Sequence, residues 1–393
     1  MTYRRAAVPA LAGGLLLTAL LWWAGASTQA LHLPGSTGVF GGQTTAELER
    51  WLVPWSYDPP ASVRFGAGMS GGIGDTTMTD GTRYLSLYET AMQIRFAAVF
   101  AFFVPVALLL IHRLPPVRGR MPAALLAMWA WGLVAGTLAV TVSAPWLIAS
   151  QGHGSYRFLP QLAGVISSGR QALVASALVA ATGAVLIARI TAKGTGPLPQ
   201  EGIPARPARL AATVGTAVIA LSLVLLSYQP VAAAIQQVSP DSGLLSEPGD
   251  LLRQWLLLGA WSDPAGAPLG DWLLYRATDA LLLAVVWWAL RRLPALFTRT
   301  TVPAMATGAV CATVLGLLAS QLLRVVTDGV GLRRGLLQLS AGIGGGVPAA
   351  LTCGLVAGVA AAVTLRVAVS RSGTGDAAAP FQDPPDAGAV GAR

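Results

Sequence analysis

Eight apolar runs constrain this chain more than any other feature, because each is long enough to cross a lipid bilayer. A spanning helix needs about 20 apolar residues to cover ~30 Å of hydrocarbon at about 1.5 Å per residue. With only 11% charged residues over 393 positions, the chain falls far below the roughly 25% usual in soluble domains. The sequence therefore predicts an all-α integral membrane protein whose eight transmembrane helices lie at 6–26, 92–112, 121–144, 170–190, 209–229, 272–290, 302–323 and 347–367.

The basic residues indicate which ends of these runs face the cytoplasm. In total, 15 basic and 4 acidic residues lie in one set of segments: the chain termini, the turns at 113–120 and 291–301, and the stretch 191–208, with the adjoining helix ends. The rest of the chain holds 11 basic and 13 acidic residues. Because Lys and Arg are enriched on the cytoplasmic side, we expect a plasma-membrane protein with both termini in the cytoplasm. The net charge of +9 follows this topology, so no nucleic-acid partner is expected.

The second half of the chain repeats the first. Residues 159–190 and 336–367 align without a gap and match at 11 of 32 positions, including a Gln, an Ile and an Arg. The segment ERWLVPWSYDP at 49–59 is similar to RQWLLLGAWSDP at 253–264, and HRLPPVRGR at 112–120 is similar to RRLPALFTR at 291–299. These pairs predict an internal duplication. Nearly all the basic residues are Arg, a bias typical of a GC-rich bacterial genome such as an actinobacterial one.

Each predicted repeat contains four spans, an even number, so both insert the same way up. The two repeats are therefore parallel and related by an axis near the membrane normal. The predicted organisation is a first repeat at 1–190 with an outer segment at 27–90, a cytoplasmic linker at 191–208, a second repeat at 209–368 with an outer segment at 230–271, and a disordered tail at 369–393.

Several segments between the spans leave alternatives open. Thr44 and Glu47 form a capping-box pattern, which predicts a short amphipathic helix on the outer face. Ala24-Gly25-Ala26 resembles a signal-peptide cleavage site, so residues 1–26 are either a retained span or a cleaved leader. Residues 324–346 are expected to be a plain outer loop or, because of four glycines at 342–346, a partly unwound re-entrant segment.

The candidate intramembrane polar site is the pair Arg276 and Asp279. Asp279 lies 12 residues from Arg291, about 18 Å from the inner boundary, where an unpaired carboxylate is costly. The i, i+3 spacing places both side chains on one helix face. The pair is either a structural self-pair or a polar gate between the repeats. Glu89 and Arg95, at the outer start of the second span, are expected at the membrane interface.

Two further groups of residues are candidate contact sites. The inner turns carry clustered arginines that fit a docking surface for a cytoplasmic partner: Arg113, Arg118, Arg120, Arg291, Arg292 and Arg299. The outer segments carry a candidate outer-face site: Trp55, Asp58, His153, Trp261 and Asp263. No nucleotide-binding, metal-binding or catalytic motif occurs, so no cofactor or metal is expected and an enzyme is less favoured.

The sequence favours a transport or export permease subunit with a path between its two repeats. Each predicted repeat consists of one span, an outer segment and three more spans. This topology is similar to that of ABC permeases of the MacB/FtsX type. The inner-loop signature of those permeases, around an Arg and Glu-Leu-Gly, is absent here. The inner loops are too short for an ATPase, so a separate subunit would bind the nucleotide. The alternative is a non-catalytic scaffold or assembly factor that docks an envelope protein through the outer segments; a membrane-embedded enzyme acting on lipid ranks third.

Overall fold

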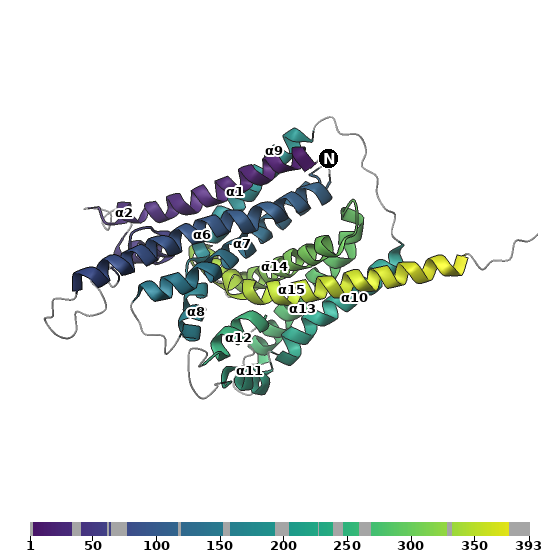
Figure 1. The fold of residues 1–393 in the computed structure, drawn as a ribbon. Helices are drawn as coiled ribbons and strands as arrows, with labels where there is room; N and C mark the ends of the chain where they lie inside the picture. The colour runs from purple at the N-terminus through teal and green to yellow at the C-terminus, as the bar shows by residue number, and fades with distance from the viewer. Residues whose placement is uncertain are drawn as a thin grey trace, which may run out of the picture.

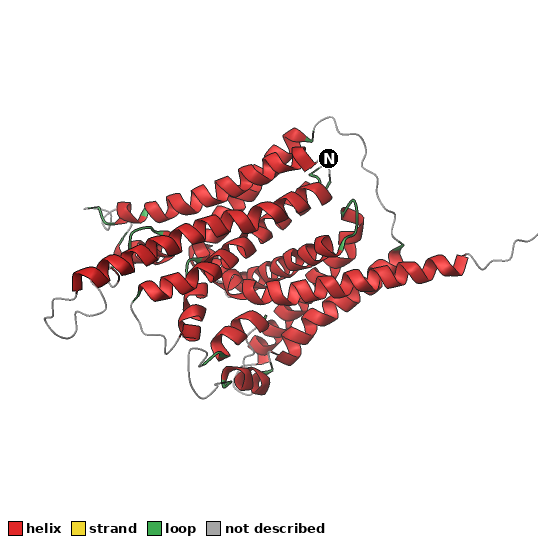
Figure 2. Cartoon of the chain, in the orientation of Figure 1, coloured by secondary structure: helices red, strands yellow, loops and turns green. Residues whose placement is uncertain are grey.

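The computed structural model describes residues 3–33, 41–60, 63, 77–116, 119–151, 158–192, 204–226, 228–238, 247–258, 269–327 and 332–376. Over these ranges the chain forms helices, turns and loops but no strand (Figure 2). The all-helical prediction is thus confirmed.

Eight helices of the described part are long and apolar enough to cross a membrane, with mean hydropathies between 1.5 and 2.5. The chain is therefore a polytopic membrane protein in contact with lipid. The helices are α1 (Tyr3–Ala26), α6 (Thr77–Arg113), α7 (Met121–Ser150), α9 (Arg170–Thr191), α10 (Ala205–Leu221, continued by the π-helical turn η3, Ser222–Leu226), α13 (Leu269–Leu296), α14 (Val302–Thr327) and α15 (Leu332–Asp376).

Short helices cap one end of the bundle, which we call the short-helix end (Figure 1). The opposite end, called the turn end, holds the connections from α6 to α7 and from α13 to α14. The helix predicted from Thr44 is present, although its N-cap is Gly41 and it begins earlier than expected. The short helices are α2 (Thr28–Leu31), α4 (Gly42–Leu52), the 3₁₀ turn η1 (Val53–Trp55), α8 (Phe158–Ser167), α11 (Gln229–Gln236) and α12 (Gly249–Leu256).

The long helices form two groups of four with the same order of neighbours. In the first group α1 packs on α6 and α9, and α7 packs on α6 and α9. In the second group α10 packs on α13 and α15, and α14 packs on α13 and α15. The groups meet where α7 contacts α14 and α15, where α9 contacts α15 and where α8 contacts α12 (Figure 1).

Glycines allow the closest helix contacts within each group. A Cβ added at Gly136 of α7 would lie 2.3 Å from Leu173 of α9. A Cβ added at Gly358 of α15 would lie 2.5 Å from the Cα atom of Ala306 in α14. Both glycines end a Gly-Leu-Val-Ala-Gly sequence, a pattern whose small residues let membrane helices approach closely.

Residues 332–346 are helical, which corrects the expectation of an outer loop at 324–346. Helix α15 runs without interruption from Leu332, so its glycines neither unwind it nor form a re-entrant turn. They pack instead: a Cβ at Gly346 would lie 2.6 Å from Leu317. In the matching part of the first half, a break at Ser168 and Gly169 separates α8 from α9, because Gly169 adopts a left-handed φ of 71°.

Several helices begin or end at other residues than the sequence analysis predicts. Helix α6 begins before residue 92 and α7 continues to Ser150, so both extend beyond the predicted spans. Helix α15 reaches Asp376, and the rest of the predicted tail lies outside the described residues. Part of the predicted linker, residues 193–203, also lies outside them.

Candidate functional site

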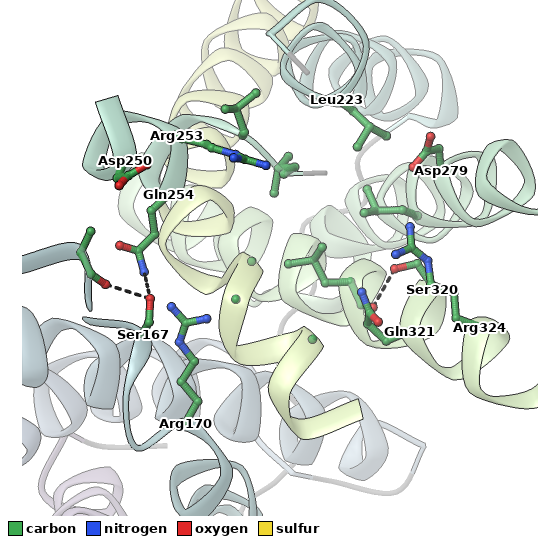
Figure 3. Close-up of a pocket in the computed structure, with 18 of the residues that line it drawn as sticks. Ser167, Arg170, Leu223, Asp250, Arg253, Gln254, Asp279, Ser320, Gln321 and Arg324 are labelled. Atoms are coloured by element: carbon green, nitrogen blue, oxygen red, sulfur yellow. Dashed lines mark hydrogen bonds between the residues drawn. The ribbon is translucent and has the colours of Figure 1, made fainter. Parts of the chain in front are cut away.

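A cavity of about 580 Å³ lies between the two groups of helices, toward the short-helix end. Its first wall comes from α8 and the start of α9, and its other walls come from η3, α12, α13, α14 and α15 (Figure 3). Its polar lining residues are Ser167, Arg170, Asp250, Arg253, Gln254, Asp279, Ser320, Gln321 and Arg324. Such a volume is in the range of small-molecule sites, roughly 300–1,000 Å³.

The predicted pair Arg276–Asp279 is present on α13. An Nη1 atom of Arg276 lies 3.1 Å from Oδ2 of Asp279, and both side chains are mostly buried. Asp279 lines the cavity, whereas Arg276 stands beside it. The carboxylate is thus neutralised on its own helix and also borders the space between the two groups.

Three arginines that line the cavity come from three different elements. Arg170, at the start of α9, donates from Nε to the carbonyl oxygen of Ile166 at 3.3 Å. Arg324 of α14 donates to the hydroxyl of Thr278 at 3.4 Å and lies 5.1 Å from the centroid of the Tyr275 ring. Arg253 of α12 donates to the side chain of Gln236 at 3.3 Å. In Figure 3 these side chains surround the cavity from opposite sides.

A hydrogen bond across the cavity edge joins the two groups of helices. Gln254 of α12 donates to the hydroxyl of Ser167 in α8 at 3.2 Å (Figure 3). Its Oε1 atom is buried and has no hydrogen-bond partner within the described residues, and the same holds for Nε of Arg324. Buried polar groups are normally paired, so these two atoms mark unused hydrogen-bonding capacity in this part of the protein.

The outer-face candidate Trp55 lies inside the first group of helices. Its side chain is fully buried, and Nε1 donates to the carbonyl oxygen of Gly169 at 2.8 Å. This side chain is therefore inaccessible to a partner, contrary to the outer-face expectation. Asp58 is half-buried and the neighbouring Tyr57 is 39% exposed. Partial burial raises the pKa of Tyr57, so its phenol stays protonated at neutral pH.

Arg95, expected at the membrane interface, is buried inside the first group of helices. Only 1% of it is exposed. It donates to the hydroxyl of Ser143 at 2.9 Å and to the carbonyl oxygen of Pro54, and its guanidinium lies 5.8 Å from the Trp55 ring centroid. The segment 53–58 folds back among α1, α6, α7 and α9, and the carbonyl oxygen of Pro54 accepts from this cation. Within the described residues, the buried Nη2 atom of Arg95 has no hydrogen-bond partner.

The two predicted docking turns lie side by side at the turn end. The backbone N–H of Thr298 donates to the carbonyl oxygen of Arg113 at 3.0 Å, and Arg120 donates to that of Ala295 at 3.3 Å. Arg120 is consequently buried. Arg292 and Arg299 are exposed, whereas Arg113 and Arg291 are half-buried.

The remaining candidates, Arg118, His153, Trp261 and Asp263, lie outside the described residues. Among the residues that are described, no group of three or more His, Cys, Asp or Glu side chains could hold a metal ion. Arg170, Arg253 and Arg324 line the cavity but were not among the candidate site residues of the sequence analysis. Comparison with family models, curated proteins and solved structures finds no match.

Proposed function

We propose that this protein is a transport permease subunit whose path runs between two duplicated four-helix repeats. The cavity carries this proposal, because it lies between the two groups and is lined by charged and amide side chains within a membrane protein. The identical order of helix neighbours in the two groups supports the duplication. On the predicted topology the cavity belongs to the outer half of the bilayer.

Between the cavity and the turn end, the two groups of helices are in contact, and Cys311 lies at this contact. It lies nine residues from Ser320 on α14, about 13 Å deeper toward the turn end. Its thiol is buried and donates to the carbonyl oxygen of Ala127 in α7 at 3.4 Å. In a permease this α7–α14 contact has to separate during transport, so Cys311 becomes transiently accessible.

Alkylation of Cys311 in native membranes tests the path. In a Cys353→Ala background Cys311 is the single cysteine of the chain, and we expect it to react slowly with a small maleimide. The matched control places one cysteine at Val286, which is equally buried but lies between α13 and α14 of a single group. Reaction at Cys311 but not at Val286→Cys supports a path between the repeats; equal protection of both contradicts it.

The adjacent turns at the turn end fit a docking surface for a separate ATPase subunit. The exposed guanidinium groups of Arg292 and Arg299 favour an acidic partner surface. We expect Arg292→Gln with Arg299→Gln to reduce co-purification of such a subunit from mild detergent. Arg209→Gln, which removes an exposed charge at the start of α10 on the same end, is the control.

A scaffold that docks an envelope protein is the second candidate function. A hollow of about 150 Å³ between α1 and the segment after η1 is lined by Trp22, Gln29, Tyr57 and Asp58. This hollow would accept a side chain from a partner on the short-helix end. Loss of a co-purifying envelope protein on Tyr57→Ala, with Cys311 fully protected, would favour this role over transport.

A further inference from the structure

Among the described residues, the lining of the cavity between the two groups of helices carries more positive than negative charge. Three arginines and two aspartates line it. Asp279 is paired with Arg276, which adds a fourth cation at the edge. Asp250 accepts a hydrogen bond from Gln236 at 3.4 Å. Neither Arg170 nor Arg324 has a carboxylate within salt-bridge distance among the described residues.

Burial makes this imbalance costly, because a guanidinium removed from water needs an anion or several acceptors. The hydroxyl of Thr278 and the ring of Tyr275 contact Arg324, and its buried Nε atom has no hydrogen-bond partner in the described part of the chain. Arg170 is half-buried, and its Nε atom donates to the carbonyl oxygen of Ile166. Its two terminal nitrogens donate to no such acceptor among the described residues, and the side chain lines the cavity.

The wall opposite Arg170 is shaped to leave room beside it. Gly345 of α15 has no side chain, and a Cβ there would lie 3.2 Å from Nη1 of Arg170. Gly342 likewise leaves space for the amide of Gln321, since a Cβ there would lie 2.6 Å from Oε1. The amides of Gln254 and Gln321 face the same space (Figure 3). Cationic and neutral donors therefore surround one volume.

The same cavity has an apolar part, lined by Leu223, Leu257, Leu258, Leu282 and Leu317. An anionic headgroup with a short apolar extension would fit both parts, whereas a neutral sugar would leave the guanidinium groups unpaired. We propose that the cavity binds a phosphate or carboxylate group, either free or as the headgroup of an anionic lipid, through Arg170, Arg324 and Arg253. This proposal deepens the proposed function. The suggestion that the anion is the transported substrate rests on that function.

Thermal unfolding of the purified full chain in an uncharged detergent, monitored by tryptophan fluorescence, tests the site. A ligand that binds only the folded protein raises the unfolding midpoint with concentration. Three probes separate the sources: inorganic phosphate, dihexanoyl phosphatidic acid and dihexanoyl phosphatidylcholine. A rise with phosphate alone indicates a free anion, and a rise with phosphatidic acid alone indicates a lipid headgroup. No rise with either anion, or an equal rise with phosphatidylcholine, overturns the proposal.

Variants locate the binding. Arg170→Gln and Arg324→Gln are each expected to weaken the apparent Kd roughly tenfold or more, as for loss of a charge-assisted hydrogen bond. Arg83→Gln removes an exposed arginine at the same end of the bundle and should leave the Kd unchanged. Equal loss in all three variants would indicate a general charge effect and overturn the site.

A second type of variant keeps the test valid if Arg170→Gln fails to fold. Gly345→Leu fills the space beside Arg170 without changing any charge and should abolish the shift caused by the anion. Binding that persists in this variant contradicts the proposal. The test is independent of the path, since Cys311 reactivity without anion binding indicates a path for another cargo. Anion binding with a protected Cys311 indicates a site in a protein that does not transport.

Discussion

Replacing Gly25 by alanine should displace the segment that closes the first group of helices. Gly25 lies near the end of α1, and a Cβ at this position would stand 1.9 Å from the backbone oxygen of Trp55. Non-bonded carbon–oxygen contacts lie at roughly 3.3 Å or more. The added methyl group would therefore force this carbonyl away by more than ~1 Å. A rotamer change cannot relieve this contact, because the added Cβ is fixed to the backbone of Gly25 and the carbonyl of Trp55 is itself a backbone group.

The cost follows from the bonds that hold the segment. The Trp55 indole donates to Gly169 at 2.8 Å, the hydroxyl of Tyr88 donates to the carbonyl oxygen of Ser56 at 2.8 Å, and Arg95 donates to that of Pro54. Two neutral hydrogen bonds of about 1 kcal/mol and one charged bond of about 2 kcal/mol are at stake. Overpacking a well-packed core typically costs about 1–3 kcal/mol. We therefore expect a loss of about 3 kcal/mol in the free energy of unfolding.

Thermal unfolding in detergent micelles, followed through the 12 tryptophans of the chain, measures this loss. For a chain of 393 residues, the expected drop in the unfolding midpoint is roughly 4 °C. Gly42→Ala is the matched control, because Gly42 lies in α4 with nothing within 4 Å of an added Cβ. Alanine there should stabilise the helix by up to about 1 kcal/mol. A Gly25→Ala midpoint at or above that of the wild type would refute the packing argument.

Three further substitutions test other contacts. Trp55→Phe removes the indole donor but keeps most of the ring packing, so it should cost about 1 kcal/mol of folding free energy. Trp23→Phe, at a residue that is 66% exposed, should leave the midpoint unchanged, and equal midpoints for the two variants would contradict the buried bond. Gly358→Leu should lower the midpoint through overpacking of the α14–α15 contact by about 1–3 kcal/mol, whereas Val359→Leu on the exposed face should not; equal effects would argue against that contact. Asp279→Asn removes a negative charge from the cavity wall and should strengthen binding of inorganic phosphate severalfold, measured by the midpoint shift, and weaker binding would count against an anion site.

Hydropathy predicted the eight spans because a helix that crosses lipid pairs its own backbone polar groups and needs about 20 consecutive apolar residues. This signal is local in the sequence. The i, i+3 pair of Arg276 and Asp279 was predictable for the same reason, since both partners lie on one helix. The positions of Arg95 and Trp55 were not. They depend on a segment that folds back into the helix group: Arg95 bonds Ser143, 48 residues away along the chain, and Trp55 bonds Gly169, 114 residues away.

Local sequence also gave the wrong structure for residues 332–346. Clustered glycines are typical of loops when they face water, since they gain nothing from packing. Here Gly346 packs against Leu317 and Gly342 against Gln321 of α14, with 2.6 Å from an added Cβ to each side chain, and the segment is helical. The cavity arginines were missed for a related reason. Arg170, Arg253 and Arg324 are far apart in sequence, and only the packing of α9, α12 and α14 makes them line one volume.

The two aligned sequence stretches both line the cavity. Residues 159–170 and 336–347 are the aligned starts of the repeated sequence, and both contribute to the cavity wall, the first through α8 and the second through α15. On the proposed duplication, the two stretches would face each other close to the twofold axis. The break at Gly169 bends the first copy, whereas the second stays straight through Gly346. This difference places Arg170 on one wall opposite a wall of glycines, so a path between the repeats would be symmetric in its helices but would hold an anion on one side.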